Sequence, residues 1–232
     1  MEIRTYKAVK GLDIVNIFTP ADDEAVRRLE AEETARREEW RKQELESHYR
    51  NTAESGVNPR YWNESIGTYI AETEEEKANL AAVRSYAAEK NQHRTLLMFG
   101  SYGTGKTHLG CGIIRERGGK YITSLKLCIE YETGSDYKAQ KNKLQILNEY
   151  SVLPMLVIDE IGRGLKTQAE REILAYILNE RYEKMLPTVL ISNLSKQEFV
   201  KLVGTAIFDR MTETAVSLNF TGKSRRLGKR TV

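Results

Sequence analysis

The chain has 232 residues, of which 40% are hydrophobic and 30% charged, and its formal net charge is +3. This length suits one α/β domain with an appendage, or two small domains. No apolar run is long enough to span a bilayer and the first residues lack a signal-peptide core, so we expect no membrane association and a cytoplasmic location.

Residues 1–55 are predicted to form a helical N-terminal arm. The stretch from Ala21 to about Arg50 is rich in Ala, Glu and Arg and lacks Gly and Pro, which favours a helix. Its apolar positions do not repeat as a sustained heptad, so a self-dimerising coiled coil is not expected. Two interpretations remain open: a solvated helix held by ion pairs, or a docking arm for another protein with Trp40 as its anchor.

The next segment changes from turns to a capped helix. Residues 51–65 are rich in turn-forming residues and predict a linker. Thr73 and Glu76 then have the spacing of a capping box, and the helix that follows would carry Leu80 and Val83 on its apolar face.

After Lys90, strands alternate with helices. Apolar strands are expected over residues 95–99, 120–124, 155–158, 188–192 and 215–220. Helices are expected from Lys106 to Gly118-Gly119, from about Asp136 to Tyr150, and after the caps Thr167/Glu170 and Ser195/Glu198. This alternation predicts a three-layer α/β fold around a parallel sheet, with the ligand at the carboxyl ends of the strands.

The connection after the first of these strands matches a phosphate-binding loop. Gly100, Gly105, Lys106 and Thr107 fit the pattern G-x-x-x-x-G-K-[ST] between a strand and a helix. Small residues let backbone N–H groups surround a phosphate chain, and the helix adds its positive N-terminal end. Lys106 is expected to reach the β- and γ-phosphates, and the Thr107 hydroxyl to bind Mg²⁺. The predicted nucleotide-binding residues are Gly100, Ser101, Tyr102, Gly103, Thr104, Gly105, Lys106, Thr107 and His108.

Two acids follow the apolar strand that begins at Met155. Asp159 is expected to hold Mg²⁺ opposite Thr107, and Glu160 to act as the general base that polarises the attacking water. An isolated acidic pair could be an exposed turn, but the phosphate-binding loop upstream favours a hydrolytic site. Asn193, at the end of the strand 188–192, has two open interpretations: it orients the lytic water or γ-phosphate, or it caps the next turn.

Together these motifs resemble the AAA+ ATPases of the DnaC/DnaI helicase-loader group, which also includes the IstB transposition helper. The resemblance extends to residues 56–61, 178–183, 208–211 and 220–226, and covers residues 55–227. It implies an AAA+ (ASCE-type) P-loop domain over residues 56–232 behind the arm 1–55, with ATP and Mg²⁺ as cofactors.

The resemblance also implies roles for further residues. Asn193 matches the sensor-1 position, Arg210 the arginine finger that acts on a neighbouring subunit's nucleotide, and Arg226 the sensor-2 arginine, with Arg225 as the alternative. Guanidinium groups at these positions would stabilise charge on the γ-phosphoryl oxygens. The chain departs from the group at Ala206, where loaders often carry another arginine. It also has no cysteine before Cys111 for the zinc-binding N-terminal domain of several relatives, which suggests a phage or prophage version.

The function implied by the resemblance is an ATP-dependent loader of a hexameric, DnaB-type replicative DNA helicase. Such a loader would self-associate into an open ring or spiral, bind single-stranded DNA and hydrolyse ATP at subunit interfaces. A transposition-helper ATPase and a non-enzymatic, nucleotide-dependent adaptor remain alternatives. Lys138, Lys141 and Lys143, with Tyr137 and Tyr150, predict either a surface for single-stranded DNA or a solvated helix face.

Overall fold

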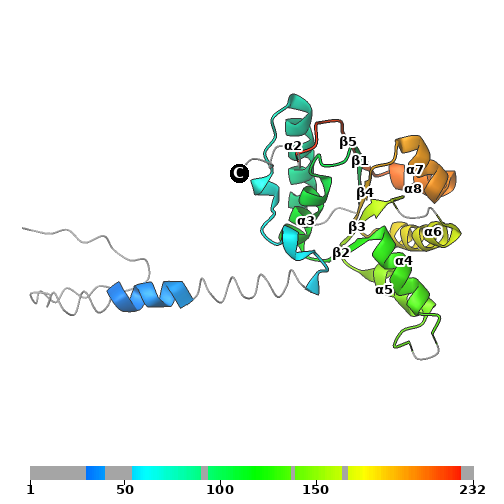
Figure 1. Ribbon diagram of the computed structural model, residues 1–232, viewed down its shortest axis with the longest axis horizontal. Coiled ribbons are helices and arrows are strands. Elements are labelled where there is room, and N and C mark those ends of the chain that lie inside the picture. The colour runs from blue at the N-terminus through cyan, green and yellow to red at the C-terminus, as the bar shows by residue number, and fades with distance from the viewer. Residues whose placement is uncertain (1–29, 40–53, 90–93, 137–138, 164–166, 226–232) are drawn as a thin grey trace, which may run out of the picture. The chain divides into compact units, whose positions relative to one another are not determined.

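The computed structural model describes residues 30–39, 54–89, 94–136, 139–163 and 167–225. Residues 30–39 form a helix within the predicted arm, and Trp40 lies outside the described residues. The described residues from Glu54 onwards form one unit around a five-stranded sheet (Figure 1). The boundary between arm and ATPase domain at residues 55 and 56 stays a prediction.

All strands of this sheet run parallel, in the order β2-β3-β4-β1-β5. The strands are β1 (Thr95–Gly100), β2 (Lys120–Thr123), β3 (Leu156–Ile161), β4 (Thr188–Ser192) and β5 (Val216–Phe220). The five strands predicted from apolar runs are therefore confirmed, and β3 extends beyond its predicted end at residue 158. Central strands of a parallel sheet are covered on both faces, which explains why β1, β3 and β4 are more apolar than the edge strands β2 and β5.

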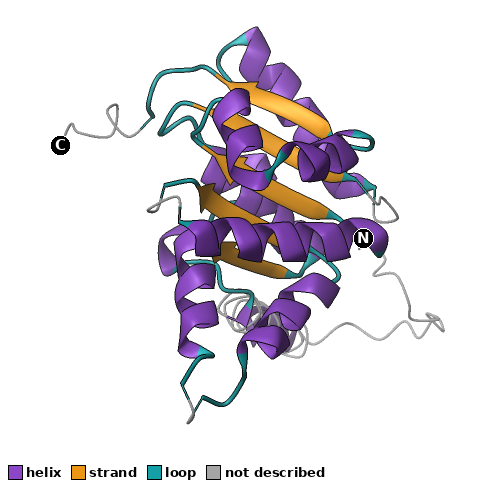
Figure 2. Cartoon of the chain, turned by 90° about the vertical axis from the view of Figure 1, so that its right-hand side faces the viewer, coloured by secondary structure: helices purple, strands orange, loops and turns teal. Residues whose placement is uncertain are grey.

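Helices cover both faces of the sheet and make three layers (Figure 2). The helices are α2 (Glu74–Ala88), α3 (Lys106–Arg117), α4 (Ser124–Thr133), α5 (Lys143–Val152), α6 (Gln168–Glu183), α7 (Lys196–Val203) and α8 (Thr205–Thr212), with short 3₁₀ turns η1 (Pro59–Tyr61) and η2 (Ile66–Thr68). Helices α2 and α3 pack with Leu96 and Met98 of β1, whereas α4 to α8 pack with Leu97 and Phe99. Alternate residues of one strand thus face the two cores.

The predicted caps are present. Thr73 and Glu76 form a capping box before α2, Thr167 accepts a hydrogen bond from the Glu170 amide before α6, and Ser195 and Glu198 form a capping box before α7. No helix within the described ranges has the length and apolarity needed to cross a membrane.

The helix predicted from about Asp136 to Tyr150 is confirmed in part, since α5 begins later, at Lys143 behind its cap Asn142, and ends at Val152. A further helix, α4, was not predicted and starts directly after β2. Thr123 is both the last residue of β2 and the N-cap of α4, so no loop signal separates the strand from the helix.

The described part of the predicted basic surface is largely neutralised. Lys141 pairs with Glu149, and Lys143 lies 3.1 Å from the Glu132 carboxylate. The buried Tyr150 donates its hydroxyl to Glu130 at 2.5 Å. Residues 137 and 138 lie outside the described residues. The contacts of the described lysines therefore fit a solvated helix face better than a surface that tracks DNA.

The predicted linker is, in its described part, a segment packed on the sheet. We call residues 54–69 the lead-in segment. Val57 and Ile66 are buried in it, and the Ser55 carbonyl oxygen accepts a hydrogen bond of 2.7 Å from the Tyr121 amide of β2. The segment predicted as a linker is therefore, in its described part, packed against the ATPase domain.

Arg181 is a large charged side chain that is almost completely buried, at 1% exposed. Its guanidinium donates to the Thr188 hydroxyl at 2.8 Å and to the backbone oxygens of Tyr150, Leu153 and Pro187 at 3.0, 2.8 and 2.7 Å. Burial lowers the pKa of Arg181 to about 10, so the side chain is still charged at neutral pH. One cation thus joins the end of α6, the end of α5 and the start of β4.

We expect Arg181→Met to lower the free energy of unfolding by about 2 to 4 kcal/mol, because it leaves several buried acceptors without donors. Chemical denaturation followed by circular dichroism measures this change. The exposed Arg171 of the same helix supplies the control, and an Arg171→Met variant that is destabilised equally would contradict the assignment.

Candidate functional site

The P-loop, residues 100–107, connects β1 to α3 at the carboxyl edge of the sheet. Its glycines adopt positive φ angles, 78° at Gly103 and 94° at Gly105, and Gly105 precedes the first residue of α3. The loop backbone therefore turns sharply before the helix, as a cradle of N–H groups requires.

Lys106 lies inside this loop and is only 4% exposed. Its ammonium donates to the backbone oxygens of Gly100 at 2.8 Å and Ser101 at 2.7 Å. An ammonium has three donors, and a phosphate oxygen would compete with these acceptors for them. Lys106 thus lies inside the loop, and its contact with the phosphates stays a prediction.

Thr107 and Asp159 face each other across the site. The Thr107 hydroxyl and the Tyr121 hydroxyl both donate to Asp159 Oδ2 at 2.7 Å. Asp159 is 2% exposed, and burial raises the pKa of its carboxyl although both hydroxyl donors act in the opposite direction.

This donor set fits Mg²⁺ in combination with a nucleotide. No group of three or more His, Cys, Asp or Glu side chains in the described part of the chain forms a metal cage. Mg²⁺ prefers one or two protein oxygens together with phosphate oxygens and water. Thr107 and Asp159 supply such hard oxygen ligands beside the P-loop.

Glu160 sits at an irregularity in β3. The register between β3 and β4 shifts between Ile158 and Ile161, and Glu160 has a φ of 57°, which is unusual for a residue with a side chain. Its carboxylate is partly exposed and pairs with Arg163. The two acids therefore do not follow the strand as predicted; they form a bulge within it, and strained backbone of this kind is concentrated at functional sites.

Asn193 is brought to the P-loop by the order of the sheet, because β4 lies next to β1. A cleft of about 700 Å³ is lined by Gly100, Ser101 and Tyr102 on one side and by Asn193 and Lys196 on the other. The position fits either of its two interpretations, and its role stays a prediction.

Two of the predicted residues do not bring their side chains to this site. Arg210 of α8 contacts Asn179 and Glu183, near the end of α6. The His108 side chain points to the lead-in segment, with Nδ1 2.8 Å from Glu64, so a role in nucleotide binding would fall to its backbone. Arg226 lies outside the described residues.

Two residues at the P-loop were not predicted as nucleotide-site residues. The Tyr69 hydroxyl donates to the Thr104 carbonyl oxygen at 3.0 Å, and Tyr121 holds Asp159 as described above. Arg225, considered only as an alternative to Arg226, donates its backbone N–H to the Gly103 carbonyl oxygen at 2.9 Å. No motif spacing connects Tyr69 or Tyr121 to the P-loop, so only the fold could reveal their contacts.

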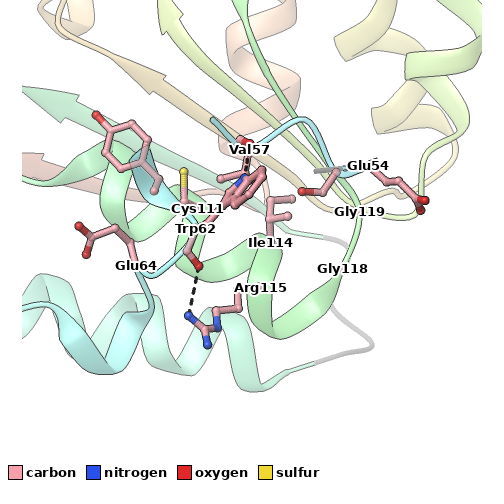
Figure 3. Close-up of a pocket in the computed structure, with 11 residues that line it drawn as sticks. Glu54, Val57, Trp62, Glu64, Cys111, Ile114, Arg115, Gly118 and Gly119 are labelled. Atoms are coloured by element: carbon pink, nitrogen blue, oxygen red, sulfur yellow. Dashed lines mark hydrogen bonds between the residues drawn. The ribbon is translucent and has the colours of Figure 1, made fainter. Parts of the chain in front are cut away.

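A second cavity, of about 400 Å³, lies along the later part of α3 (Figure 3). Trp62, Cys111 and Ile114 line it, with Glu64 and Arg115 at its polar side. Trp62 is fixed there, because its indole N–H donates to the Val57 carbonyl oxygen at 2.9 Å.

Comparison with known proteins places these features in context. The model of the family described as "IstB-like ATP binding protein" matches residues 23–232. The replicative helicase loader DnaC of Escherichia coli (strain K12) is 31% identical over 162 residues, which cover 68% of this chain and 66% of that protein. DnaC of Buchnera aphidicola subsp. Acyrthosiphon pisum (strain APS) is 29% identical over 168 residues, with the same coverage. The match thus spans slightly less than two thirds of these relatives' length.

Solved structures share the fold. A crystal structure of the DnaC helicase loader has a TM-score of 0.62 at 22% identity, covering 71% of this chain and 100% of that one. A crystal structure of DnaI has a TM-score of 0.59 at 21% identity, covering 73% and 94%. AMPPCP-bound DnaA from Aquifex aeolicus has a TM-score of 0.58 at 19% identity, covering 72% and 53%. The predicted α/β P-loop fold of the AAA+ type is therefore confirmed.

Tyr121 donates to the carboxylate of Asp159, an expected Mg²⁺ ligand, and the hydrogen-bonding partner of a metal ligand sets that ligand's orientation. We therefore expect Tyr121→Phe to raise the Mg²⁺ concentration needed for half-maximal nucleotide binding by about tenfold. Titration of Mg²⁺ against a fluorescent ATP analogue measures this midpoint. Tyr176→Phe is the matched control, since it also removes one hydroxyl hydrogen bond, an exposed one from α6 to Asn148 of α5. A midpoint that is unchanged in Tyr121→Phe would show that Asp159 needs no such partner.

Proposed function

This chain belongs to the family of IstB-like ATP-binding proteins, and we propose that it is an ATP-dependent loader of a replicative DNA helicase. The family is one of P-loop ATPases, and the likeness to DnaC favours the loader among its members. The observation that carries the ATP-dependent part is the contact of 2.7 Å between Thr107 and Asp159 beside the P-loop. We place the proposed role in the cytoplasm.

In the proposed reaction the P-loop binds the phosphate chain of ATP. Backbone N–H groups of the loop and the Lys106 ammonium would hold the phosphates, and Thr107 and Asp159 would hold Mg²⁺. Mg²⁺, when bound, supplies positive charge to the β- and γ-phosphate oxygens. Glu160 would accept a proton from the attacking water once its carboxylate leaves Arg163. Asn193 would orient that water or the γ-phosphate from the opposite side of the cleft.

Arg210 fits a role in a neighbouring subunit better than one in its own. Helix α6 runs from the carboxyl end of β3 back to the amino end of β4. Its last turns therefore lie towards the amino ends of the strands, whereas the P-loop lies at their carboxyl ends. Arg210 is held beside those last turns by Asn179 and Glu183. We propose that self-association into an open ring or spiral brings Arg210 to the neighbour's γ-phosphate.

The proposed partners are a hexameric, DnaB-type helicase and single-stranded DNA. We assign helicase binding to the arm, residues 1–55, and assembly and ATP hydrolysis to residues 56–232. The proposal that single-stranded DNA lies in the assembly rests on likeness to loaders, since the described lysines of the predicted basic surface pair with acids. A transposition helper is the second candidate, because the matching family model carries the name of IstB.

The loader proposal predicts association of the full chain with a replicative helicase in the presence of ATP. Size-exclusion chromatography with multi-angle light scattering measures it, and removal of residues 1–53 should abolish it while leaving nucleotide binding intact. If the chain did not associate with the helicase in the presence of ATP, in the presence of ADP or without nucleotide, the loader proposal would be contradicted. Binding to a transposase and to duplex DNA would instead support the second candidate.

The hydrolytic site predicts two different defects. Lys106→Ala should weaken ATP binding by at least about tenfold, because it removes a charge-assisted contact to phosphate. Glu160→Gln should retain ATP but lower turnover by about 10² to 10⁴, the usual contribution of a general base. Phosphate release with single-stranded DNA present measures turnover, and Lys77→Ala on the exposed face of α2 is the control. Equal turnover in all variants would favour the non-enzymatic adaptor.

A further inference from the structure

Two segments far apart in the sequence hold the P-loop from outside. From the end of the lead-in segment, the Tyr69 hydroxyl donates to the Thr104 carbonyl oxygen at 3.0 Å. From the segment after β5, the Arg225 amide donates to the Gly103 carbonyl oxygen at 2.9 Å. Two consecutive carbonyl oxygens of the loop are therefore bonded to residues outside it.

The Arg225 side chain is engaged with the same region. Its Nη2 lies 2.7 Å from Glu76 Oε1, its Nη1 donates to the Ile70 carbonyl oxygen, and its Cζ lies 4.3 Å from the centre of the Tyr69 ring. A guanidinium stacked on a tyrosine and paired with a carboxylate holds both partners in place. These contacts direct the Arg225 side chain to α2 and Tyr69.

Glu76 is itself held as an anion. Its carboxylate accepts from the Glu72 and Thr73 amides at 2.8 and 3.2 Å. Burial acts to raise the pKa of Glu76, but these amides and Arg225 outweigh it, so the net shift is downward. Glu76 therefore connects the capping box of α2 to Arg225.

The contact is too close for larger residues in the loop. A Cβ atom on Gly105 would lie 2.5 Å from the Tyr69 ring, and a Cβ on Gly103 would lie 2.2 Å from the Ser224 hydroxyl. These glycines thus allow the outer segments to pack directly on the loop, in addition to allowing its turns.

We propose that Tyr69, Glu76 and Arg225 form a clasp that positions the P-loop backbone for the phosphates that ATP and ADP share. The clasp fixes the carbonyl oxygens of Gly103 and Thr104 on the outside, which leaves the loop's N–H groups to form the anion-binding concavity. The inference deepens the proposed function and rests on its ATP binding. Arg225 is then a positioning residue that acts through the loop, distinct from an arginine that contacts the γ-phosphate.

The test compares affinities for fluorescent analogues of ATP and ADP in Tyr69→Phe, Glu76→Gln and Arg225→Ala. We expect each variant to lose affinity for both nucleotides by the same factor, about 3- to 30-fold, from the loss of one or two hydrogen bonds. The double variant Tyr69→Phe/Arg225→Ala should lose less than the product of the single losses, because its residues act as a unit. Arg60→Ala is the matched control, since it removes an arginine 6.0 Å from the ring of Tyr61, away from the loop.

Two affinity results would overturn the clasp. Loss of ATP affinity with unchanged ADP affinity in Arg225→Ala would make Arg225 a γ-phosphate contact. Unchanged affinity for both nucleotides in all three variants would show that the loop needs no outside support.

Amide hydrogen exchange without nucleotide separates this inference from the proposed function. Tyr69→Phe removes one hydroxyl and keeps the ring, and we expect it to speed exchange at residues 101–105 selectively. Faster exchange together with a wild-type chain that binds no nucleotide would support the clasp and contradict ATP binding. Unchanged exchange in Tyr69→Phe and Arg225→Ala would overturn the clasp whatever the wild-type chain binds.

Discussion

The close packing of α3 on the sheet is the constraint on which the site depends. Strand β4 lies between β1 and β3, so Thr107, the last residue of the P-loop, reaches Asp159 only if α3 crosses β4 at short range. Gly110 makes this possible, since a Cβ there would lie 2.6 Å from the Ile191 side chain and 3.3 Å from that of Val157. A glycine in a helix interior costs stability, and here it brings the two expected Mg²⁺ ligands together.

The carboxyl ends and the amino ends of the strands lie beside different functional groups. The carboxyl ends of the strands lie beside the P-loop, Asp159 and Asn193, which under the proposed function bind the phosphate chain and orient the water. Arg210 lies beside the far end of α6, where the buried Arg181 also joins α5, α6 and β4. A rigid joint at that end would fix the direction in which Arg210 is presented. Under the proposed function, this separation makes the arginine useful only to a neighbour, so hydrolysis depends on assembly.

The sequence carried enough information for the strands, the P-loop and the acidic pair, because apolar runs and fixed spacings are local signals. It was less informative where one residue has two roles: Thr123 ends β2 and caps α4, and the missing loop led to one helix being predicted in place of two. The bulge at Glu160 arises from pairing with β4, which no local pattern reports. Tyr69 reaches the P-loop only through the fold, so neither periodicity nor motif spacing connects it to the loop. The motif placed Arg225 only as an alternative γ-phosphate contact, and its backbone contact with Gly103 comes from the fold.

The proposed clasp and the proposed hydrolytic residues act on different parts of the nucleotide. A contact that supports the P-loop backbone stabilises ATP and ADP equally, and a ligand can shift an equilibrium only by its differential affinity for the two states. Affinity gained through Tyr69 and Arg225 therefore cannot by itself drive a change between assembled and released forms. That difference has to come from groups that meet the γ-phosphate: Glu160, Asn193 and the neighbour's Arg210 in the proposed assembly. The affinity for nucleotide within one subunit and the discrimination between ATP and ADP at the subunit interface can thus be adjusted independently.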